Sequence, residues 1–283
     1  MDDALTRLRP RLAGRLPGRV GEAVNYALEG SGKRVRGVLT LLAAESAGAP
    51  GDVSGVAAAV EVVHAYSLVH DDLPCMDDDD LRRGRPTVHR RFDVPAATAA
   101  GVAMVPLAVI AALTGAADAG LPRDAGGAIV FELMSHAGAD GMIGGQALDL
   151  ESEGRALGVD ELDRLHSAKT GALFVAAARV GAIAARADRS RIDALGQFGA
   201  HAGLAFQIVD DVLDVTATAE SLGKTTGRDA AMNKSTYPAA VGIAEATLRA
   251  RKLVSDAESA LHRAGLASER LSEFARQLTE RAA

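Results

Sequence analysis

The sequence predicts an all-α protein, a single domain over residues 1–283 that folds as a large helix bundle. Alanine is the most frequent residue, and it has the highest helix propensity. Several apolar segments repeat at spacings of three and four residues, as the buried face of a helix does. Because β-branched and aromatic residues are never clustered as strands require, we expect no sheet.

Four segments carry the helical pattern most clearly. Residues 53–70 and 194–215 each show an apolar stripe at helical spacing. Residues 96–120 are apolar but alanine-rich and only weakly hydrophobic, which favours a buried core helix over a membrane span. We therefore expect no stable membrane anchor. Residues 244–278 place leucine and alanine among many charges, which predicts one exposed amphipathic helix.

Composition narrows the function classes. The chain is 48% hydrophobic and 24% charged, as in ordinary globular proteins, and its formal net charge of −6 argues against a nucleic-acid binder. The single cysteine, Cys75, excludes a disulfide framework and a cysteine-based metal cluster. The first residues contain no apolar core of signal-peptide length, so we expect a cytoplasmic protein.

The acidic residues are concentrated in one place: six aspartates lie between residues 71 and 80. Pro74 disfavours a helical conformation at Leu73, so the preceding helix should end just after Asp72. Asp77 would then return towards Asp71 through a short loop. An acidic run of this kind is often only a solvated loop or helix cap, and that interpretation stays open for this motif alone.

A second aspartate motif comprises Asp210, Asp211 and Asp214. On an α-helix these positions lie at about 0°, 100° and 40° around the axis, so the three carboxylates share one face. They would repel one another unless a cation were bound, and hard oxygen ligands suit Mg²⁺. Both motifs follow apolar helices, which makes two solvated loops a weaker explanation.

Basic residues accompany the acidic motifs. Carboxylates that hold a metal, together with lysine and arginine that neutralise phosphate, are what a diphosphate bridged by Mg²⁺ requires. Each cation taken singly would more often be a surface ion pair. His64 lies seven residues before Asp71 and points roughly the same way, as a ligand contact or as a packed core residue. The candidate cations are Lys33, Arg34, Arg36, Arg82, Arg83, Lys169, Lys224 and Lys234.

Common catalytic signatures are missing from the sequence. It contains no GxxxxGK[ST] loop, no GxGxxG turn, no GxSxG elbow and no HExxH. The usual nucleotide-binding, serine-hydrolase and zinc-protease interpretations are therefore excluded.

The remaining motifs resemble those of the trans-isoprenyl diphosphate synthases, a polyprenyl synthetase family. They are GKRVR, HAYSLVHDDLPCMDDDDLRRGRPT, GGQALDLE, KTGALF, FQIVDDVLD and GKTTGRDAAMNKSTYP, and they extend from residue 32 to residue 238. The first motif carries the two-residue insertion, in DDLPCMD, of the bacterial farnesyl diphosphate synthases. The resemblance implies the isoprenoid synthase fold, an antiparallel helix bundle around a deep central cavity, assembled as a homodimer.

The resemblance also implies a reaction, the head-to-tail condensation of isopentenyl diphosphate with an allylic diphosphate. It implies three Mg²⁺ ions per active site, with Asp71, Asp77 and Asp210 as main ligands and Asp72, Asp211 and Asp214 supporting. It places Arg82, Lys169, Thr170, Gln207, Lys224 and Lys234 at the allylic diphosphate, and Lys33, Arg36, His64 and Arg83 at isopentenyl diphosphate. Its catalytic set is Asp71, Asp72, Asp77, Arg82, Lys169, Asp210 and Lys224.

Product length is expected to depend on the floor of the cavity. Tyr66 lies five residues before Asp71, about 7.5 Å along a helix, where its ring would block a chain longer than fifteen carbons. Ser67 beside it is small. We favour a farnesyl product, with geranylgeranyl or geranyl diphosphate as alternatives. Three positions depart from the family pattern: Gly37 replaces a proline, Val102 replaces an aspartate, and Pro106 should interrupt the helix that lines the cavity.

Three rival classes are weaker. A terpene cyclase would fold its substrate against many aromatic side chains, whereas this chain has three Tyr, six Phe and no Trp. A non-catalytic partner subunit of a prenyl synthase would lack one or both aspartate motifs. A plain acidic metal-binding module would not need the lysine and arginine set.

Overall fold

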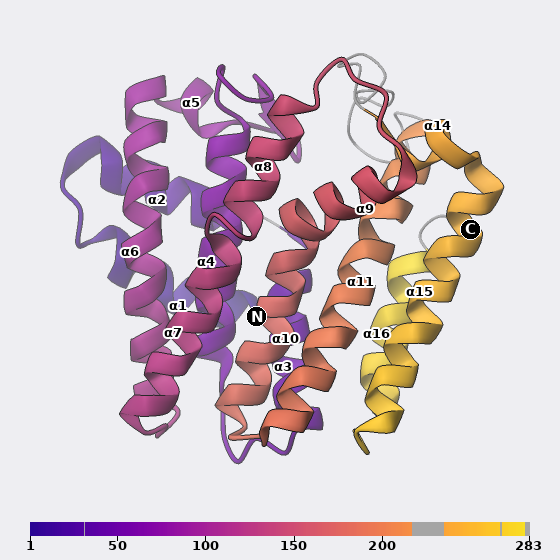
Figure 1. Cartoon of the computed structure of the whole chain (residues 1–283). Helices are drawn as coiled ribbons and strands as arrows, with labels where there is room; N and C mark the ends of the chain where they lie inside the picture. The colour runs from indigo at the N-terminus through magenta and orange to yellow at the C-terminus, as the bar shows by residue number, and fades with distance from the viewer. Residues whose placement is uncertain (31, 217–234, 267, 281–283) are drawn as a thin grey trace.

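The computed structural model describes residues 1–30, 32–216, 235–266 and 268–280. It is a helix bundle, as the sequence predicts (Figure 1). The N-terminal half contains α1 (Asp2–Ala13), α2 (Gly18–Glu29), α3 (Val35–Ser46), α4 (Ser54–Asp71), α5 (Val88–Arg91), α6 (Val94–Asp118) and α7 (Arg123–Ala137). The C-terminal half contains α8 (Met142–Glu151), α9 (Val159–His166), the π-helix η1 (Ser167–Gly171), α10 (Ala172–Ala184), α11 (Arg189–Thr216), α14 (Tyr237–Val241), α15 (Ile243–Arg263) and α16 (Glu269–Glu280).

The core is built where α4 packs on α6 and where α10 packs on both α3 and α11. Small residues let these helices approach closely. A side-chain carbon at Gly115 of α6 would lie 2.4 Å from the backbone of Gly55 on α4. A carbon at Gly181 of α10 would lie 2.3 Å from the carbonyl oxygen of Thr40 on α3. Alanine and glycine side chains offer little contact area each, but they let the helices pack closely.

Helix α6 corrects two expectations. It runs unbroken through Pro106, although we expected an interruption there. Pro106 and Val102 both lie on the exposed side of α6, so the Val102 carbonyl that loses its helical N–H donor lies on the side that water reaches. The helix does belong to the core, to which it contributes Ala97, Met104 and Ala111, but it is more apolar than expected, with a mean hydropathy of 2.1 over its most apolar stretch. It is long and apolar enough to cross a membrane by length and composition alone.

The C-terminal prediction of one helix over residues 244–278 is wrong. Helix α15 ends at Arg263, and α16 begins at Glu269 and packs against it (Figure 1). Gly265 between them has φ +66°, a left-handed conformation that ends helices. The amphipathic pattern is confirmed at Ala257 and Leu261, which are buried, but not at Leu248, which the pattern placed on the same apolar stripe and which is exposed.

A two-stranded ribbon between α4 and α5 was not expected. Strands β1 (Leu81–Arg82) and β2 (Arg85–Pro86) pair antiparallel around a two-residue turn. Both turn residues have positive φ, 54° at Arg83 and 74° at Gly84, as a primed hairpin turn requires. The strands are too short to show an alternating pattern in the sequence. The ribbon holds Arg82 and Arg83 beside the end of α4.

Candidate active site

The first aspartate motif folds as the sequence predicts. Helix α4 ends at Asp71, and Asp72 follows as its C-cap. The backbone N–H of Asp77 donates to the carbonyl oxygen of Asp71 at 2.9 Å, and that of Asp79 donates to the carbonyl oxygen of Asp72 at 3.2 Å. The loop that follows Pro74 therefore returns Asp77 to the end of α4.

This loop crowds negative charge. Burial raises the pKa of Asp71 to about 6, and the charge of Asp77 adds to the increase, whereas Lys169 opposes it. Asp72 is buried and is paired with Arg82, whose Nε donates to Asp72 Oδ1 at 2.7 Å. Burial and the neighbouring negative charges therefore favour the neutral form of Asp71. A bound cation would stabilise its ionised form.

The second motif lies near the end of α11, and its three carboxylates do not share one open face. Asp210 and Asp214 are half-buried, whereas Asp211 is only 3% exposed. Asp211 Oδ1 accepts from Gln207 Nε2 at 3.0 Å, and its Oδ2 accepts from the backbone N–H of Tyr237 at 3.1 Å. Both oxygens of Asp211 therefore meet protein donors, which the angular argument from the sequence did not anticipate.

Arg36 shows that the two motifs lie near each other. Burial lowers the pKa of its guanidinium to about 10, while the charges of Asp210 and Asp71 act in the opposite direction. One cation on α3 therefore lies within electrostatic range of both a first-motif and a second-motif carboxylate.

His64 is also placed at this site. Its Nε2 lies 3.3 Å from Arg36 Nη1, and the guanidinium of Arg36 stacks over the ring of Phe174 at 5.1 Å. Burial lowers the pKa of His64 well below its ordinary value, and the positive charges of Arg36 and Arg83 lower it further. His64 is therefore a neutral imidazole beside a buried arginine.

A cavity of about 80 Å³ lies behind the first motif. It brings together five residues singled out from the sequence, Arg34, His64, Asp72, Arg82 and Arg83. Glu61 and Arg85 complete its charged lining. The concentration of guanidinium groups suits a phosphate-bearing ligand. Lys33 lies in the turn immediately before α3.

Lys169 and Thr170 lie in η1, a single π-helical turn of the kind often found at functional sites. Lys169 Nζ donates to Asp149 Oδ2 of α8 at 2.5 Å, and Thr170 Oγ1 donates to Gln207 Oε1 at 2.9 Å. Asp149 was not among the predicted site residues, although it belongs to the motif GGQALDLE. Its spacing from Lys169 carries no helical or strand signal, so the pair depends on the tertiary fold.

The remaining candidates are distributed as follows. Tyr66 is half-buried one and a half turns below Asp71, with its ring edge-to-face with His70 at 5.0 Å between centroids. Ser67 Oγ donates to the carbonyl oxygen of His64 at 2.9 Å. Lys224 and Lys234 lie outside the described residues.

The donor set fits Mg²⁺ completed by a ligand. All the candidate donors are carboxylate oxygens, which Mg²⁺ prefers. Among the residues that the structure describes, no three histidine, cysteine, aspartate or glutamate side chains converge on one point as a ready metal cage. Mg²⁺ commonly binds through one or two carboxylates, waters and substrate phosphates, so incomplete protein coordination agrees with this metal.

A helical bundle that combines two aspartate motifs with partly buried arginines has the chemistry of a diphosphate-binding enzyme. The family model described as Polyprenyl synthetase matches residues 18–265. The chain is 44% identical to the farnesyl diphosphate synthase of Escherichia coli (strain K12) over 86% of this chain and 81% of that protein. It is 42% identical to a chloroplastic geranylgeranyl pyrophosphate synthase of Arabidopsis thaliana over 88% and 72%.

The fold gives the same answer. The crystal structure of the geranylgeranyl pyrophosphate synthetase from Pyrococcus horikoshii is similar with a TM-score of 0.84 and 30% identity, over 98% of this chain and 94% of that chain. The chain therefore belongs to the polyprenyl synthetase family. It is a short-chain prenyltransferase, as the motifs predict.

Proposed function

We propose that this protein condenses isopentenyl diphosphate with dimethylallyl or geranyl diphosphate and releases farnesyl diphosphate. The observation that carries the proposal is the position of Arg36, which lies within electrostatic range of Asp71 and Asp210 and in contact with His64. An arginine that interacts with carboxylates of both motifs and with the cavity residue His64 is the arrangement that diphosphates bridged by Mg²⁺ require. The names of the relatives include farnesyl diphosphate synthases, which supports this choice of product.

Asp71, Asp77 and Asp210 would hold Mg²⁺, with Asp214 beside them. Asp72 and Asp211, which are bonded to protein donors, would support these ligands from behind. We propose three ions when substrate is present. Bound Mg²⁺ would polarise the allylic diphosphate and make it a better leaving group.

The allylic diphosphate would bind to Arg82 and Lys169, with Lys224 and Lys234 assigned to it by the family resemblance. Thr170 and Gln207, which are bonded to each other, would direct oxygen dipoles towards the allylic carbons and stabilise developing positive charge. Asp149 holds Lys169 through an ion pair, and the Lys169 charge acts on the Asp71 carboxylate.

Isopentenyl diphosphate would bind to His64 and Arg83 of the basic cavity, together with Lys33 and Arg36 of the neighbouring segment at the start of α3. Its double bond would attack the allylic carbon as the carbon–oxygen bond to diphosphate breaks, and a proton would then leave the new chain. We assign that proton to the released diphosphate, because His64 is neutral but lies among arginines that disfavour its protonation.

Product length remains the finer part of the proposal. Tyr66 below Asp71 supports a farnesyl product, whereas the geranylgeranyl synthases among the relatives support a longer one. We propose farnesyl diphosphate because the tyrosine ring is packed on His70 and is half-buried in place.

We also propose a cytoplasmic homodimer in which α6 and α7 form the contact between subunits. These helices pack on each other, and their outward residues include Val102, which is 61% exposed, and Phe131, which is 72% exposed. An apolar face of this kind is typical of an interface between subunits. Light scattering after gel filtration tests it: Val102→Asp and Phe131→Asp together should give a monomer.

The experiment that tests the function supplies isopentenyl and dimethylallyl diphosphates together. We expect diphosphate release only when Mg²⁺ is present, and a fifteen-carbon alcohol after dephosphorylation and chromatography. Absence of any prenyl product with Mg²⁺ present would contradict the proposal. A twenty-carbon alcohol as the main product would keep the reaction and replace farnesyl by geranylgeranyl diphosphate.

A further inference from the structure

Glu61 is a buried carboxylate of α4 to which the proposed reaction gives no role. It is 3% exposed and lies on the wall of the basic cavity. A buried carboxylate needs partners to remain in place, and those of Glu61 belong to the first turn of α3. Glu61 Oε1 accepts the backbone N–H of Gly37 at 2.7 Å, and Oε2 lies 3.9 Å from Arg34 Nη1.

The start of α3 needs this contact. Its N-cap is Arg34, which has φ 49° and a side chain that can only donate, so no side-chain cap bond is made there. Gly37 is the third residue of α3, and its N–H has no acceptor within the helix. Glu61 therefore caps α3 from the neighbouring helix, and its negative charge also suits the positive end of the helix dipole.

Gly37 is suited to this cap in two ways. Proline, the residue that the family resemblance leads us to expect, has no N–H and would leave Glu61 Oε1 without this donor. A side-chain carbon at position 37 would lie 2.8 Å from Met1 Cε and 3.0 Å from Glu61 Cγ. Helix α1 covers the same turn, because Arg34 Nε donates to Asp2 Oδ1 at 2.9 Å.

The cap also fixes the position of Arg36. Arg36 lies in the same first turn of α3, and its Nη1 is 3.3 Å from His64 Nε2. His64 follows Glu61 by three residues on α4, so the two side chains share one face of that helix. One face of α4 therefore makes two contacts with the first turn of α3. Glu61 binds the backbone N–H of Gly37, and His64 contacts the guanidinium of Arg36.

We propose that Glu61 is a positioning residue for the diphosphate of isopentenyl diphosphate. By capping α3 at Gly37 it sets the register of α3 on α4, and thereby places Arg34 on the wall of the basic cavity and Arg36 beside the cavity residue His64. This inference rests on the proposed function, because it concerns one of the two substrates of that reaction.

The first test compares Glu61→Ala with Glu61→Gln in steady-state kinetics. Loss of the acceptor in Glu61→Ala should raise KM for isopentenyl diphosphate roughly tenfold, the effect of losing one charge-assisted hydrogen bond, and leave KM for the allylic substrate within about twofold. Glu61→Gln keeps an oxygen that accepts from Gly37, so it should recover most of the loss. Glu45→Ala, which removes an exposed ion pair with Arg270 at the far end of α3, is the matched control.

The second test is a double-mutant cycle with Gly37→Pro, which removes the donor of the same bond but also adds carbons beside Met1 and Glu61. Gly37→Ala, which adds a carbon and keeps the N–H, measures the steric part of the effect and is subtracted from it. Gly37→Pro alone should also raise KM for isopentenyl diphosphate, and combining it with Glu61→Ala should add less than twofold. Additive effects, equal increases in both KM values, or no recovery in Glu61→Gln would each overturn the proposal. Thermal melts identify variants that fail to fold. If Glu61→Ala is one of them, the KM of Glu61→Gln for isopentenyl diphosphate decides whether the proposal holds.

A failure of the proposed function is distinguishable from a failure of this inference. If the wild-type protein forms no prenyl product, calorimetry with isopentenyl diphosphate alone still tests Glu61. The inference then requires Glu61→Ala to bind roughly tenfold more weakly than Glu61→Gln. Equal affinities of these two variants would overturn it.

Discussion

Asp211 accepts the backbone N–H of Tyr237 at 3.1 Å, a bond that joins the aspartate motif of α11 to the first residue of α14. The same carboxylate holds Gln207, and the ring of His166 stacks on that of Tyr237 at 5.6 Å. One aspartate of the motif is therefore an internal acceptor that fixes Gln207 and α14 around the site.

Substituting Asp211 should consequently affect stability. Asp211→Ala leaves the half-buried Gln207 amide and the buried Tyr237 N–H without their acceptor, at about 1–3 kcal/mol for each unsatisfied group. We expect the free energy of unfolding in urea to fall by at least about 2 kcal/mol. Asp256→Ala removes only an exposed i,i+4 pair with Lys252 and should leave the free energy of unfolding close to that of the wild type. Similar effects of the two variants would contradict the buried role of Asp211.

The carboxylates assigned to Mg²⁺ should control activity and not stability. Asp71→Asn and Asp210→Asn should each lower kcat by roughly 10²–10³, the usual effect of removing one preorganised electrostatic group. Asp78→Asn is a matched control from the same acidic loop, because Asp78 is exposed. We expect its kcat to stay within about twofold. A comparable loss in Asp78→Asn would mean that the net charge of the loop matters and not the position of Asp71.

The position of Tyr66 predicts product length. Tyr66→Ala should shift the main product from fifteen to twenty or more carbons, because it opens space below Asp71. Chromatography of the dephosphorylated products measures the change. Ser67→Ala, one residue further along α4, removes only a bond to the His64 carbonyl and should leave the product unchanged. An unchanged product in Tyr66→Ala would remove this residue from the floor of the cavity.

The buried neutral His64 predicts a pH dependence of stability. Because burial lowers its pKa below 6.5 in the folded state, the unfolded chain binds the proton more readily. Stability is then complete above pH 6.5 and falls as the pH drops below that value, by up to about 1.4 kcal/mol per pH unit for this group. His64→Gln should flatten the slope of unfolding free energy between pH 7 and pH 5. Replacing the exposed His262 by glutamine should leave the slope as it is in the wild type.

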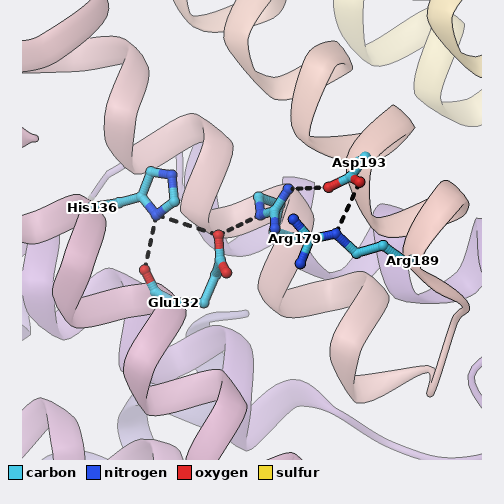
Figure 2. Close-up of polar contacts among 5 residues, drawn as sticks. All are labelled: Glu132, His136, Arg179, Arg189 and Asp193. Atoms are coloured by element: carbon cyan, nitrogen blue, oxygen red, sulfur yellow. Dashed lines mark hydrogen bonds and ion pairs between the residues drawn. The ribbon is translucent and has the colours of Figure 1, made fainter.

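An ion-pair network predicts where the bundle is most sensitive to loss of charge. Figure 2 shows Arg179 of α10 between Glu132 of α7 and Asp193 of α11. The side chain of Arg179 is 15% exposed, whereas that of Arg189, which pairs with the same Asp193, is 80% exposed.

Arg179→Ala should therefore lower the free energy of unfolding by about 2–4 kcal/mol, because it leaves Glu132 inside the bundle without its main counter-charge. Arg189→Ala breaks only a surface pair and should cost less than about 1 kcal/mol. Urea unfolding measures both variants. A loss in Arg189→Ala as large as that in Arg179→Ala would show that burial does not set the strength of this network.

Local sequence signals were sufficient for much of the site. Pro74 predicted the end of α4 and the return of Asp77, because proline constrains the residue before it wherever it occurs. The apolar stripe of α11 predicted the helix that carries Asp210. Two other local signals gave wrong predictions. Pro106 did not break α6, because its lost hydrogen bond lies on the exposed side of the helix. Residues 244–278 form two helices and not one, because the chain turns at Gly265.

The sequence by itself determined the helical class, the two aspartate motifs and the family, since composition, periodicity and motif spacing are properties of the chain alone. Only the tertiary structure decided which partner each carboxylate binds. Asp149 with Lys169, Glu61 with Gly37, and Asp211 with Tyr237 are pairs between different helices. Their partners depend on how those helices pack, and no local spacing encodes that choice.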